Sequence, residues 1–482
     1  MTTPKKLKAD NLPSSRHYFF CGIGGRGMRA IVPVLLAYGH EVSGSDRAYD
    51  NGDLPEIFDS LKHMGVKLYP QDGSGVKGCD EVIVSSAVED SIPDIKAAKK
   101  AAIPIKKRAE LLAFLANSKR SVAVAGTSGK TTVTGMTGHI LSTLGAYPTM
   151  INGGEDRRFD AGKGSAFIGT GPFVIEADES DGSIALYKPA VALINNISLD
   201  HKSLDELRTL FLDFAHEASE AVVINADCIE CAKLIKKIKD KTIITYRLLP
   251  ENKKKFAKAD TPTIFARDIE LTPTGTNFTV EGYGHKIPAT LRLLGKHNVQ
   301  NALAALAACA ALGMPLKEAV AALASFAGIR RRMELIGSEK GVIVFDDFGH
   351  NPDKIRASLQ ALKAHPGRLW AIFQPHGFGP MKMMRKELVK TFADNLDADD
   401  AVLMPPIYFA GGTVDKSISS ADVVADLRQE KVRAYTFEHR NDIPTWLAAQ
   451  VKAGDRILVM GARDDTLTHF AHQLLLAIAN NN

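Results

Sequence analysis

The chain has 482 residues, of which 45% are hydrophobic and 24% are charged. These proportions are ordinary for a folded globular protein, so they exclude an intrinsically disordered chain, a collagen-like fibre and a small disulfide scaffold. At about 150 residues per domain, this length predicts roughly three domains. The net charge of +5 is small for such a chain, and we expect neither nucleic acid nor an anionic membrane as a partner.

The five cysteines include one close pair, Cys228 and Cys231, in the order Cys-Ile-Glu-Cys. Such a C-x-x-C pair occurs in redox and zinc sites, but no second pair follows at the spacing of a zinc ribbon, so we expect a reduced thiol pair. The polar start of the chain lacks the apolar core of a signal peptide, and no stretch reaches the ~20 apolar residues of a membrane helix. These features predict a cytoplasmic protein without stable membrane association.

Strand and helix patterns alternate along the first third of the chain, as they do in a doubly wound parallel sheet. Strands are expected at 17–25, 41–46 and 81–88, and helices at 28–38, 92–102 and 108–118. The last of these helices leads into a new strand. The first domain is therefore predicted to cover residues 1–118.

The middle third begins the same alternation again and then changes character. Buried strands are expected at 121–126, 172–178, 190–196 and 221–227. From 241 to 295, short runs separated by turn residues predict an antiparallel patch, and helices follow at 298–313 and 316–327. The second domain is predicted to cover residues 119–328.

The last third returns to alternating strands and helices. Its strands are expected at 341–347, 369–374, 401–404, 433–437 and 455–461, in a third domain that covers residues 329–482. We thus predict an α/β protein with three domains: an N-terminal Rossmann-like domain, a central domain like that of P-loop ATPases, and a C-terminal Rossmann-like domain.

A glycine-rich loop joins the strand at 121–126 to the helix after it. The loop reads Gly126-Thr127-Ser128-Gly129-Lys130-Thr131-Thr132, a shortened relative of the Walker A pattern. Glycines let backbone N–H groups wrap a phosphate, and the start of the helix adds positive potential. Lys130 can reach the β- and γ-phosphates, and the Thr131 hydroxyl can ligate Mg²⁺. The segment therefore predicts an ATP site.

Polar residues follow two further strands of the middle third. Glu176 and Asp178 end one strand, and Asp200 and His201 closely follow the next. The carboxyl ends of strands in an open α/β sheet converge on one crevice. We therefore expect Glu176 and His201 to share a metal ion with Thr131.

A second glycine loop follows the first strand of the chain. It contains Gly22-x-Gly24-x-x-Gly27, and Asp46 lies about 20 residues later, as in a dinucleotide fingerprint. Alone, this pattern shows only that a diphosphate can bind, and the diphosphate of a UDP-linked compound would fit as well as that of NAD. An enzyme that uses ATP on a nucleotide-linked substrate accounts for both glycine loops.

Nine short motifs occur in an order that resembles the Mur ligase family: GIGGRGM, SGSD, GTSGKTT, EADESD, NNISLDH, GKHNVQN, RRRMEL, DDFGHNP and QPH. Enzymes of this family join amino acids or peptides to UDP-N-acetylmuramic acid in peptidoglycan synthesis. The resemblance implies that ATP phosphorylates the substrate carboxylate to an acyl phosphate, which the incoming amine then attacks. It also implies ATP and Mg²⁺ as cofactors, and we expect a monomer or a weak homodimer.

The resemblance assigns roles by motif. Catalysis would depend on Lys130, Glu176, His201 and Arg332, and the metal ligands would be Thr131, Glu176 and His201. ATP would contact the phosphate loop together with His297, Asn298, Asn301, Arg331, Arg332 and Asp347. The UDP-sugar and the amine would contact Gly22, Gly24, Gly25, Gly27, Asp46, Ser86, His350 and His376.

The identity of the amine stays open between two branches of the family. One branch adds L-alanine, and the other adds the recycled tripeptide L-Ala–γ-D-Glu–meso-diaminopimelate. The resemblance favours a single L-amino acid, although this chain has Gly377 where the L-alanine branch usually has an arginine. We therefore expect another cation to hold the carboxylate of the amine, with Lys382, Arg385 and Arg463 as candidates.

Two other classes of protein compete with this interpretation. A nicotinamide-dependent dehydrogenase would use the first glycine loop, but it leaves Glu176, His201 and the H-N-x-x-N pattern unexplained. A binding protein without catalytic activity is the second alternative, and the intact Lys130, Thr131 and Glu176 argue against it.

Overall fold

The computed structural model describes residues 15–85, 89–158, 165–198, 202–250, 253, 262–409, 417–462, 464 and 466–481. The chain divides into two compact units. The first unit comprises Met1–Phe265, Val280–Ile287 and Asn301–Leu323, and the second comprises Ala266–Thr279, Pro288–Gln300 and Ala324–Asn482.

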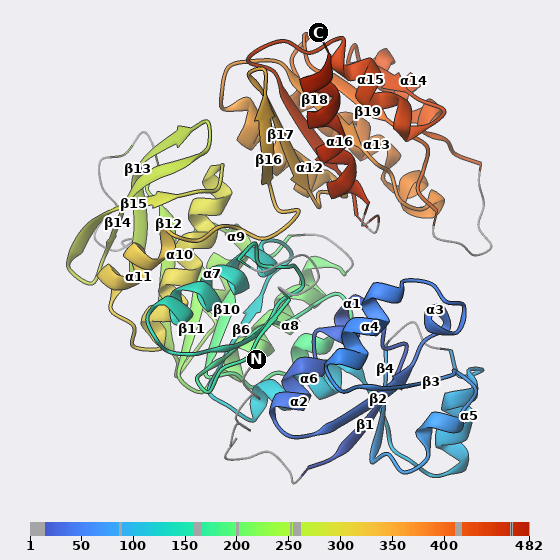
Figure 1. Cartoon of the computed structure of the whole chain (residues 1–482). Helices are drawn as coiled ribbons and strands as arrows, with labels where there is room; N and C mark the ends of the chain where they lie inside the picture. Colours follow the sequence, from blue (N-terminus) through green and yellow to red (C-terminus); the bar gives the residue numbers. More distant parts are fainter. Residues whose placement is uncertain are drawn as a thin grey trace. The chain divides into compact units, whose positions relative to one another are not determined.

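The first unit begins with a parallel five-stranded sheet in the order β3-β2-β1-β4-β5 (Figure 1). Its strands are β1 (His17–Cys21), β2 (Glu41–Ser45), β3 (Lys67–Tyr69), β4 (Glu81–Val84) and β5 (Ile105–Lys107). Alternate side chains of β1 face opposite sides, as a strand requires. Tyr18 and Phe20 pack with residues of α2 (Val32–Ala37), α4 (Pro55–His63) and α6 (Arg108–Asn117), whereas Phe19 and Cys21 pack with α5 (Pro93–Lys100).

The central sheet has ten strands in the order β15-β14-β13-β12-β11-β10-β6-β9-β7-β8. Parallel pairing joins β12 (Thr242–Leu248), β11 (Ala221–Asn225), β10 (Val191–Ile194), β6 (Ser121–Ala125), β9 (Phe173–Glu176) and β7 (Thr149–Ile151). The remaining strands are β8 (Ala166–Phe167), β13 (Ile264–Thr272), β14 (Gly275–Gly282) and β15 (His285–Leu291). The parallel strands bring the loops after β6, β9 and β10 to one edge.

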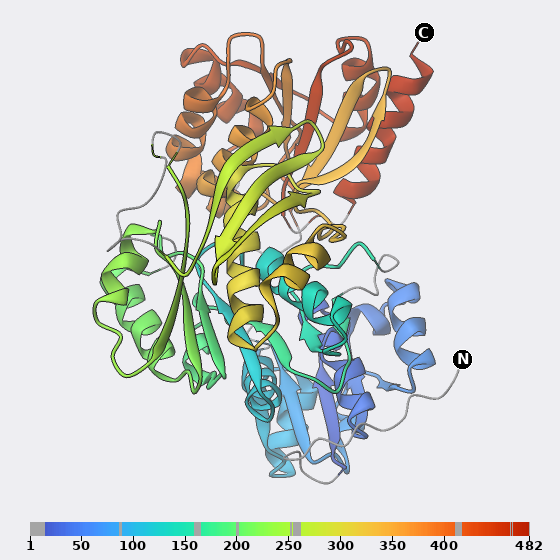
Figure 2. The same cartoon turned by 90° about the vertical axis from the view of Figure 1, so that its left-hand side faces the viewer.

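Helices accompany the central sheet. They are α7 (Lys130–Thr143), α8 (Leu204–His216), α9 (Ile229–Ile235), α10 (Lys296–Ala311) and α11 (Leu316–Leu323). Within the first unit, α11 packs against α7 (Figure 2), where the His139 ring hydrogen-bonds to the carbonyl oxygen of Ala322 at 3.0 Å. This contact holds the helix that begins at the phosphate loop.

The second unit contains a six-stranded sheet in the order β16-β17-β21-β18-β19-β20, with only the β16–β17 pair antiparallel. Its strands are β16 (Glu334–Glu339), β17 (Val342–Asp347), β18 (Leu369–Phe373), β19 (Ala401–Met404), β20 (Arg433–Thr436) and β21 (Arg456–Met460). Both faces are covered by apolar clusters, which include residues of α12 (Pro352–Lys363), α13 (Phe378–Asn395) and α14 (Ser420–Gln429) on one side and of α15 (Ile443–Ala448) and α16 (Leu467–Asn480) on the other.

The three sheets confirm the predicted α/β class with Rossmann-like outer sheets and a central sheet that carries the phosphate loop. Several predicted bounds were wrong. The first strand ends at Cys21 because Gly22 turns the chain at φ 80°. The helix expected at 28–38 is broken into α1 (Arg26–Arg29) and α2, since Pro33 has no N–H for the carbonyl of Arg29. The predicted domain limits at 118 and 328 stay predictions.

Across the part of the chain that the structure describes, no helix combines the length and the apolar character needed to span a membrane.

Candidate functional site

The phosphate loop connects β6 to α7 in the first unit, where the motif predicted it. Gly126 and Gly129 have φ values of 141° and 80°, which side chains rarely adopt. A Cβ on Gly129 would lie 2.5 Å from Nδ2 of Asn195 and 2.6 Å from Oδ1 of Asn301. The glycine is therefore required both by the backbone conformation and by the close approach of two amides. Thr132 lies buried in the first turn of α7.

Two asparagines at the end of β10 hold the loop from one side. Oδ1 of Asn196 accepts the N–H of Ser128 at 2.8 Å and the hydroxyl of Thr127 at 2.9 Å. Both asparagines donate through Nδ2 to the carbonyl oxygen of Ser128 at 3.0 Å. The NNISLDH motif marked this segment in the sequence, but the roles of Asn195 and Asn196 were missed because they depend on which strands are neighbours.

Asn195 is buried and links the loop to two other elements. Its Oδ1 accepts the hydroxyl of Tyr246 on β12 at 2.6 Å, and its Nδ2 also donates to Oδ1 of Asn301 on α10 at 3.1 Å. Asn301 was predicted to lie near the nucleotide, and it does lie beside the phosphate loop. One of its contacts is thus to the amide of Asn195, which supports the loop.

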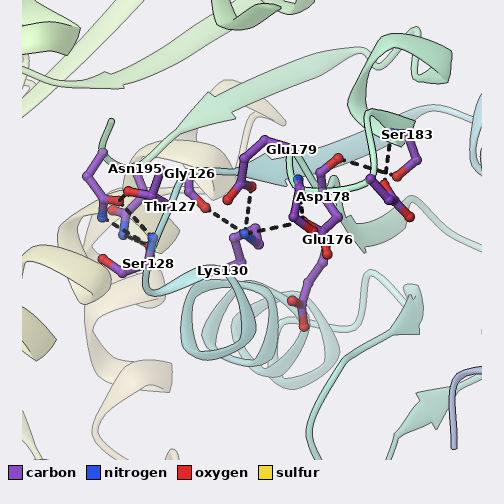
Figure 3. Close-up of polar contacts among 12 residues, drawn as sticks. Gly126, Thr127, Ser128, Lys130, Glu176, Asp178, Glu179, Ser183 and Asn195 are labelled. Atoms are coloured by element: carbon purple, nitrogen blue, oxygen red, sulfur yellow. Dashed lines mark hydrogen bonds and ion pairs between the residues drawn. The ribbon is translucent and has the colours of Figure 1, made fainter. Parts of the chain in front are cut away.

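Lys130 makes three polar contacts within the loop region (Figure 3). Its Nζ donates to the carbonyl oxygen of Gly126 at 2.7 Å and to Oε2 of Glu179 at 2.6 Å, and it lies 3.8 Å from Oδ1 of Asp178. Burial raises the pKa of Glu179, and the ammonium of Lys130 opposes that rise. Burial would also raise the pKa of Asp178, but Lys130 and Ser180 together hold it below its usual value.

Glu179 was missed as a site residue, although it lies inside the EADESD motif that the sequence analysis singled out. The motif pointed to Glu176 and Asp178 because they end a hydrophobic strand. Glu179 lies in the turn after that strand, and its side chain is only 5% exposed. Its ion pair positions the ammonium of Lys130 at the mouth of the loop.

Thr131 and Glu176 are brought together as predicted. The Thr131 hydroxyl donates to Oε2 of Glu176 at 3.2 Å, and Oε1 of Glu176 accepts the N–H of Gly153 at 2.6 Å. A hydroxyl and a carboxylate beside a phosphate loop are the protein ligands that hold Mg²⁺ in phosphoryl-transfer enzymes. These two residues fit that role. His201, the third predicted ligand, lies outside the described residues, and the described part of the chain holds no cluster of three His, Cys, Asp or Glu suited to a metal.

The N-terminal glycine loop is held by Asp46. Oδ2 of Asp46 accepts the N–H of Gly24 at 2.8 Å, and Oδ1 accepts the N–H of Ala48 at 2.9 Å. A Cβ on Gly24 would lie only 2.9 Å from Oδ2, so this glycine is needed for the contact. Asp46 lies at the loop as expected, but in a supporting position. Gly25 and Gly27 are exposed there, and Ser86 lies outside the described residues.

Arg108 lies beside the N-terminal glycine loop, and its charge also acts on Asp178. A Cβ on Gly27 would touch the Arg108 side chain at 3.4 Å. Burial has the largest effect on the pKa of Asp178 and raises it, whereas Lys130 and Ser180 lower it. The guanidinium of Arg108 adds a smaller lowering effect. Arg108 was predicted only as the start of a helix, because nothing in its spacing signals its position beside Gly27.

In the second unit, Asp347 at the end of β17 is fixed by three hydrogen bonds. It accepts from the N–H of Met333 at 2.9 Å, the N–H of Gly349 at 3.0 Å and the hydroxyl of Ser358 at 2.7 Å. Burial lowers the pKa of His297, and the nearby charge of Asp347 opposes that effect. Asn298, the next residue, donates to the carbonyl oxygen of Leu294 at 2.8 Å. The structure therefore places His297 and Asp347 near each other.

The arginine run at 330–332 has two different environments. Arg331 is buried with φ 58°, and its guanidinium donates to the carbonyl oxygens of Asp464 at 3.0 Å and Gly461 at 2.6 Å. These contacts give Arg331 a structural position inside the unit. Arg332 lies over the Phe348 ring at 4.9 Å. The predicted phosphate contacts of both arginines stay predictions.

His350 and His376, both predicted to contact substrate, lie beside each other. Their ring centroids are 5.4 Å apart, and Nδ1 of His350 hydrogen-bonds to the carbonyl oxygen of Phe348 at 2.9 Å. Burial and the charge of Lys354 lower the pKa of His350 to about 3. The imidazole is therefore neutral at physiological pH.

The three cations proposed for the amine carboxylate differ in their surroundings. Arg385 is held by both carboxylate oxygens of Asp426, at 2.6 and 2.8 Å. Nζ of Lys382 lies 3.4 Å from the hydroxyl of Ser417 on the exposed surface. Arg463 lies outside the described residues. Because its guanidinium is already paired with Asp426, Arg385 is poorly suited to binding a second carboxylate.

Known protein families match three successive parts of the chain. Family models match at residues 17–120 (Mur ligase family, catalytic domain), 124–309 (Mur ligase middle domain) and 331–463 (Mur ligase, glutamate ligase domain). The UDP-N-acetylmuramate–L-alanine ligase of Dictyoglomus turgidum is 34% identical over 93% of this chain and 94% of its own length. The chain belongs to the Mur ligase family. The ligase of the same name from Geotalea daltonii is 36% identical over 92% of this Mur ligase and 94% of its own length.

Solved structures agree with this assignment. The UDP-N-acetylmuramate–alanine ligase of Thermotoga maritima superposes with a TM-score of 0.75 at 26% identity, covering 97% of this chain and 100% of that one. A murein peptide ligase from Psychrobacter arcticus superposes with a TM-score of 0.66, also at 26% identity, over 97% of this chain and 99% of that one. The resemblance inferred from the motifs is confirmed, and with it the three-domain fold of the Mur ligases.

Proposed function

We propose that this Mur ligase joins L-alanine to the carboxylate of UDP-N-acetylmuramate at the expense of ATP, in peptidoglycan precursor synthesis. The observation that carries the proposal is the phosphate loop with Lys130 at its mouth and Thr131 against Glu176. Relatives 33–36% identical along nearly the whole chain are named for this reaction.

The reaction begins with transfer of the γ-phosphoryl group to the substrate carboxylate. Such a transfer depends on positioning and on stabilising the negative charge that develops on the phosphoryl oxygens. The ammonium of Lys130 supplies the positive charge that stabilises these oxygens. Its ion pair with Glu179 keeps the ammonium at the loop before ATP binds. The amine then attacks the acyl phosphate and phosphate leaves.

Mg²⁺ is part of the proposal. Thr131 and Glu176 would hold it, together with His201, and the bound cation would neutralise charge on the phosphates. Because Gly153 fixes the other oxygen of Glu176 through its N–H, the carboxylate is oriented before the metal binds.

The UDP-sugar is assigned to the N-terminal glycine loop. Gly22, Gly24, Gly25 and Gly27 would let the diphosphate approach the backbone closely, because none of them carries a side chain. Asp46 fixes the loop through its two backbone contacts, one of which is to the N–H of Gly24. Ser86 belongs to the same predicted set. Arg108, beside Gly27, adds a positive charge that suits a diphosphate.

The remaining assignments concern Asn301 of the first unit and four residues of the second unit. His297, Asn298 and Asn301 would lie near the adenine, Asp347 near the ribose, and Arg332 at the phosphates. Domain limits near residues 118 and 328 fall between α6 and β6 and between α11 and β16.

Both nucleotide substrates belong to the cytoplasm, so we place the reaction there. The active form is proposed to be a monomer or a weak homodimer.

A second candidate keeps the chemistry and changes the amine to the recycled tripeptide. It is favoured by Gly377, which has no side chain to bind the carboxylate of a free amino acid, and by the similarity to a murein peptide ligase. A phosphate-release assay with ATP and UDP-N-acetylmuramate, run with L-alanine, other amino acids or the tripeptide, tests both. We expect turnover with L-alanine. Turnover that is hundreds of times more efficient with the tripeptide would establish the second candidate, and release independent of any amine would contradict both.

A further inference from the structure

The C-x-x-C pair, Cys228 and Cys231, lies next to Ile197 in the segment that supports the phosphate loop. The proposed ligation reaction uses neither thiol. Cys228 follows β11 and precedes α9, and it is half-buried. Cys231 lies in α9 and is fully buried in the apolar core of the first unit. An oxidant in solution can therefore reach Cys228, whereas Cys231 is protected behind it.

The two thiols interact with each other. A hydrogen bond from Cys231 is the main reason that the pKa of Cys228 falls to about 6, and the same bond raises the pKa of Cys231. A half-exposed thiolate beside a second thiol is the arrangement in which cysteine oxidation proceeds to a disulfide. The described residues offer no third His, Cys, Asp or Glu that would turn the pair into a metal site.

Cys228 also contacts the segment that supports the phosphate loop. Its Sγ accepts the N–H of Ile197 at 3.4 Å. Ile197 lies between Asn196 and Ser198, and both of these side chains hydrogen-bond to the Thr127 hydroxyl, at 2.9 and 2.7 Å. The sulfur of Cys228 is thus separated from the loop by one short run of backbone.

A second route joins the pair to the loop through Tyr246. Both thiols interact electrostatically with this buried tyrosine, whose hydroxyl donates to Oδ1 of Asn195 at 2.6 Å. Asn195 in turn donates to the carbonyl oxygen of Ser128. The pair therefore lies close to both asparagines that hold the loop, to Asn196 by way of Ile197 and to Asn195 by way of Tyr246.

We propose that Cys228 and Cys231 form a reversible disulfide that loosens the phosphate loop through Ile197. The Cys228 thiolate attacks hydrogen peroxide, the O–O bond breaks, and a sulfenic acid and hydroxide form. The Cys231 thiol then attacks that sulfur, the S–S bond forms, and water leaves. The two electrons from the thiols reduce the peroxide.

The oxidised pair changes the support of the loop in a defined way. The sulfur of Cys228 loses its negative charge and moves toward Cys231, so it becomes a poorer acceptor for the N–H of Ile197. Within the ligase proposed above, on which this step rests, ATP affinity should fall about three- to tenfold, the effect of losing one ordinary hydrogen bond.

Mass spectrometry tests the disulfide without reference to activity. Residues 209–233 form one tryptic peptide that carries both cysteines and no other. After treatment of the full-length protein with hydrogen peroxide, we expect this peptide to be lighter by two hydrogen atoms, and dithiothreitol to reverse the change. Cys228→Ser should stay unoxidised at Cys231, while Cys79→Ser serves as the matched control and should behave as the wild type.

Hydrogen exchange of residues 126–130 tests the coupling. We expect faster exchange in the oxidised protein, weaker ATP binding, and no change in either measurement for peroxide-treated Cys228→Ser. Two persistent free thiols under peroxide, a sulfinic acid at Cys228 in place of the disulfide, or a disulfide with unchanged loop exchange would overturn the proposal. If oxidation speeds the hydrogen exchange of residues 126–130 but neither redox state binds ATP, the coupling between the disulfide and the loop is supported. The proposed function is then contradicted.

Discussion

Nζ of Lys130 lies 2.6 Å from Oε2 of Glu179, and both side chains are largely buried. The pair holds a positive charge at the mouth of a loop whose backbone turns at two glycines. Because the same ammonium also donates to the carbonyl oxygen of Gly126, it is oriented by the loop that it serves. This arrangement keeps the cation in place before a phosphate arrives, which limits the reorganisation that the reaction requires.

Replacement of Lys130 by alanine tests this role. We expect ligation to slow by about 10³-fold or more, because the charge that stabilises the transferred phosphoryl group is lost. UDP-N-acetylmuramate binding should be unchanged, since the substrate is assigned to the other glycine loop. Phosphate release and calorimetric binding of the UDP-sugar measure the two effects. A variant that retains more than about a tenth of wild-type activity would exclude Lys130 from the chemical step.

The hydroxyl of Tyr246 provides a test of the support behind the loop. Tyr246→Phe removes the donor to Oδ1 of Asn195 while keeping the ring, and it should lower the free energy of unfolding by about 1 kcal/mol. The KM for ATP should rise about threefold as Asn195 loses its orientation. Tyr283→Phe, at an exposed tyrosine, is the matched control. An unchanged KM for ATP together with reduced stability would show that the Tyr246 hydroxyl stabilises the fold without affecting ATP binding.

The sequence predicted those parts of the site that consist of consecutive residues. Gly126–Thr132 specify their own turn, and the loop appears where the motif placed it. Glu179, Asn195 and Asn196 were missed because their partners lie across neighbouring strands, and the order β10-β6-β9 cannot be derived from one sequence. The arginine run at 330–332 pointed to phosphates, yet Arg331 is bound by carbonyl groups that the fold brings from residues 461 and 464.

Asp46 offers a test of the N-terminal loop. Asp46→Ala removes the acceptors of two backbone N–H groups, so the loop should lose its fixed turn and the KM for the UDP-sugar should rise about tenfold. The KM for ATP should stay the same. Asp53→Ala, at an exposed aspartate in the same region, is the control. Equal increases in both KM values would show a general loss of structure in place of a local one.

His350 predicts a pH dependence of stability. Its pKa of about 3 lies below the value of about 6.5 expected in the unfolded chain, so the folded state favours the neutral ring. The stability that this preference contributes is present above about pH 6.5 and is lost as the pH falls toward the folded pKa. The urea midpoint of the wild type should therefore fall between pH 7 and pH 4. His350→Gln, which cannot titrate, should show a shallower fall, and an identical slope in both proteins would contradict the assignment.

The last prediction separates the cations proposed for the amine. Both carboxylate oxygens of Asp426 already bind the guanidinium of Arg385, so a second carboxylate would have to compete with a bidentate ion pair. Arg385→Ala should therefore leave the KM for L-alanine within about twofold of the wild type, while the free energy of unfolding falls by up to about 1 kcal/mol, as for a partly exposed pair. Arg463→Ala should raise the KM for L-alanine more than the KM for ATP, because a free amino acid has its only carboxylate beside the attacking nitrogen. The steady-state constants of both variants, measured with the amine and ATP varied in turn, decide between them. A large rise in the amine KM for Arg385→Ala, with no effect of Arg463→Ala, would mean that the Asp426 pair opens to admit the substrate.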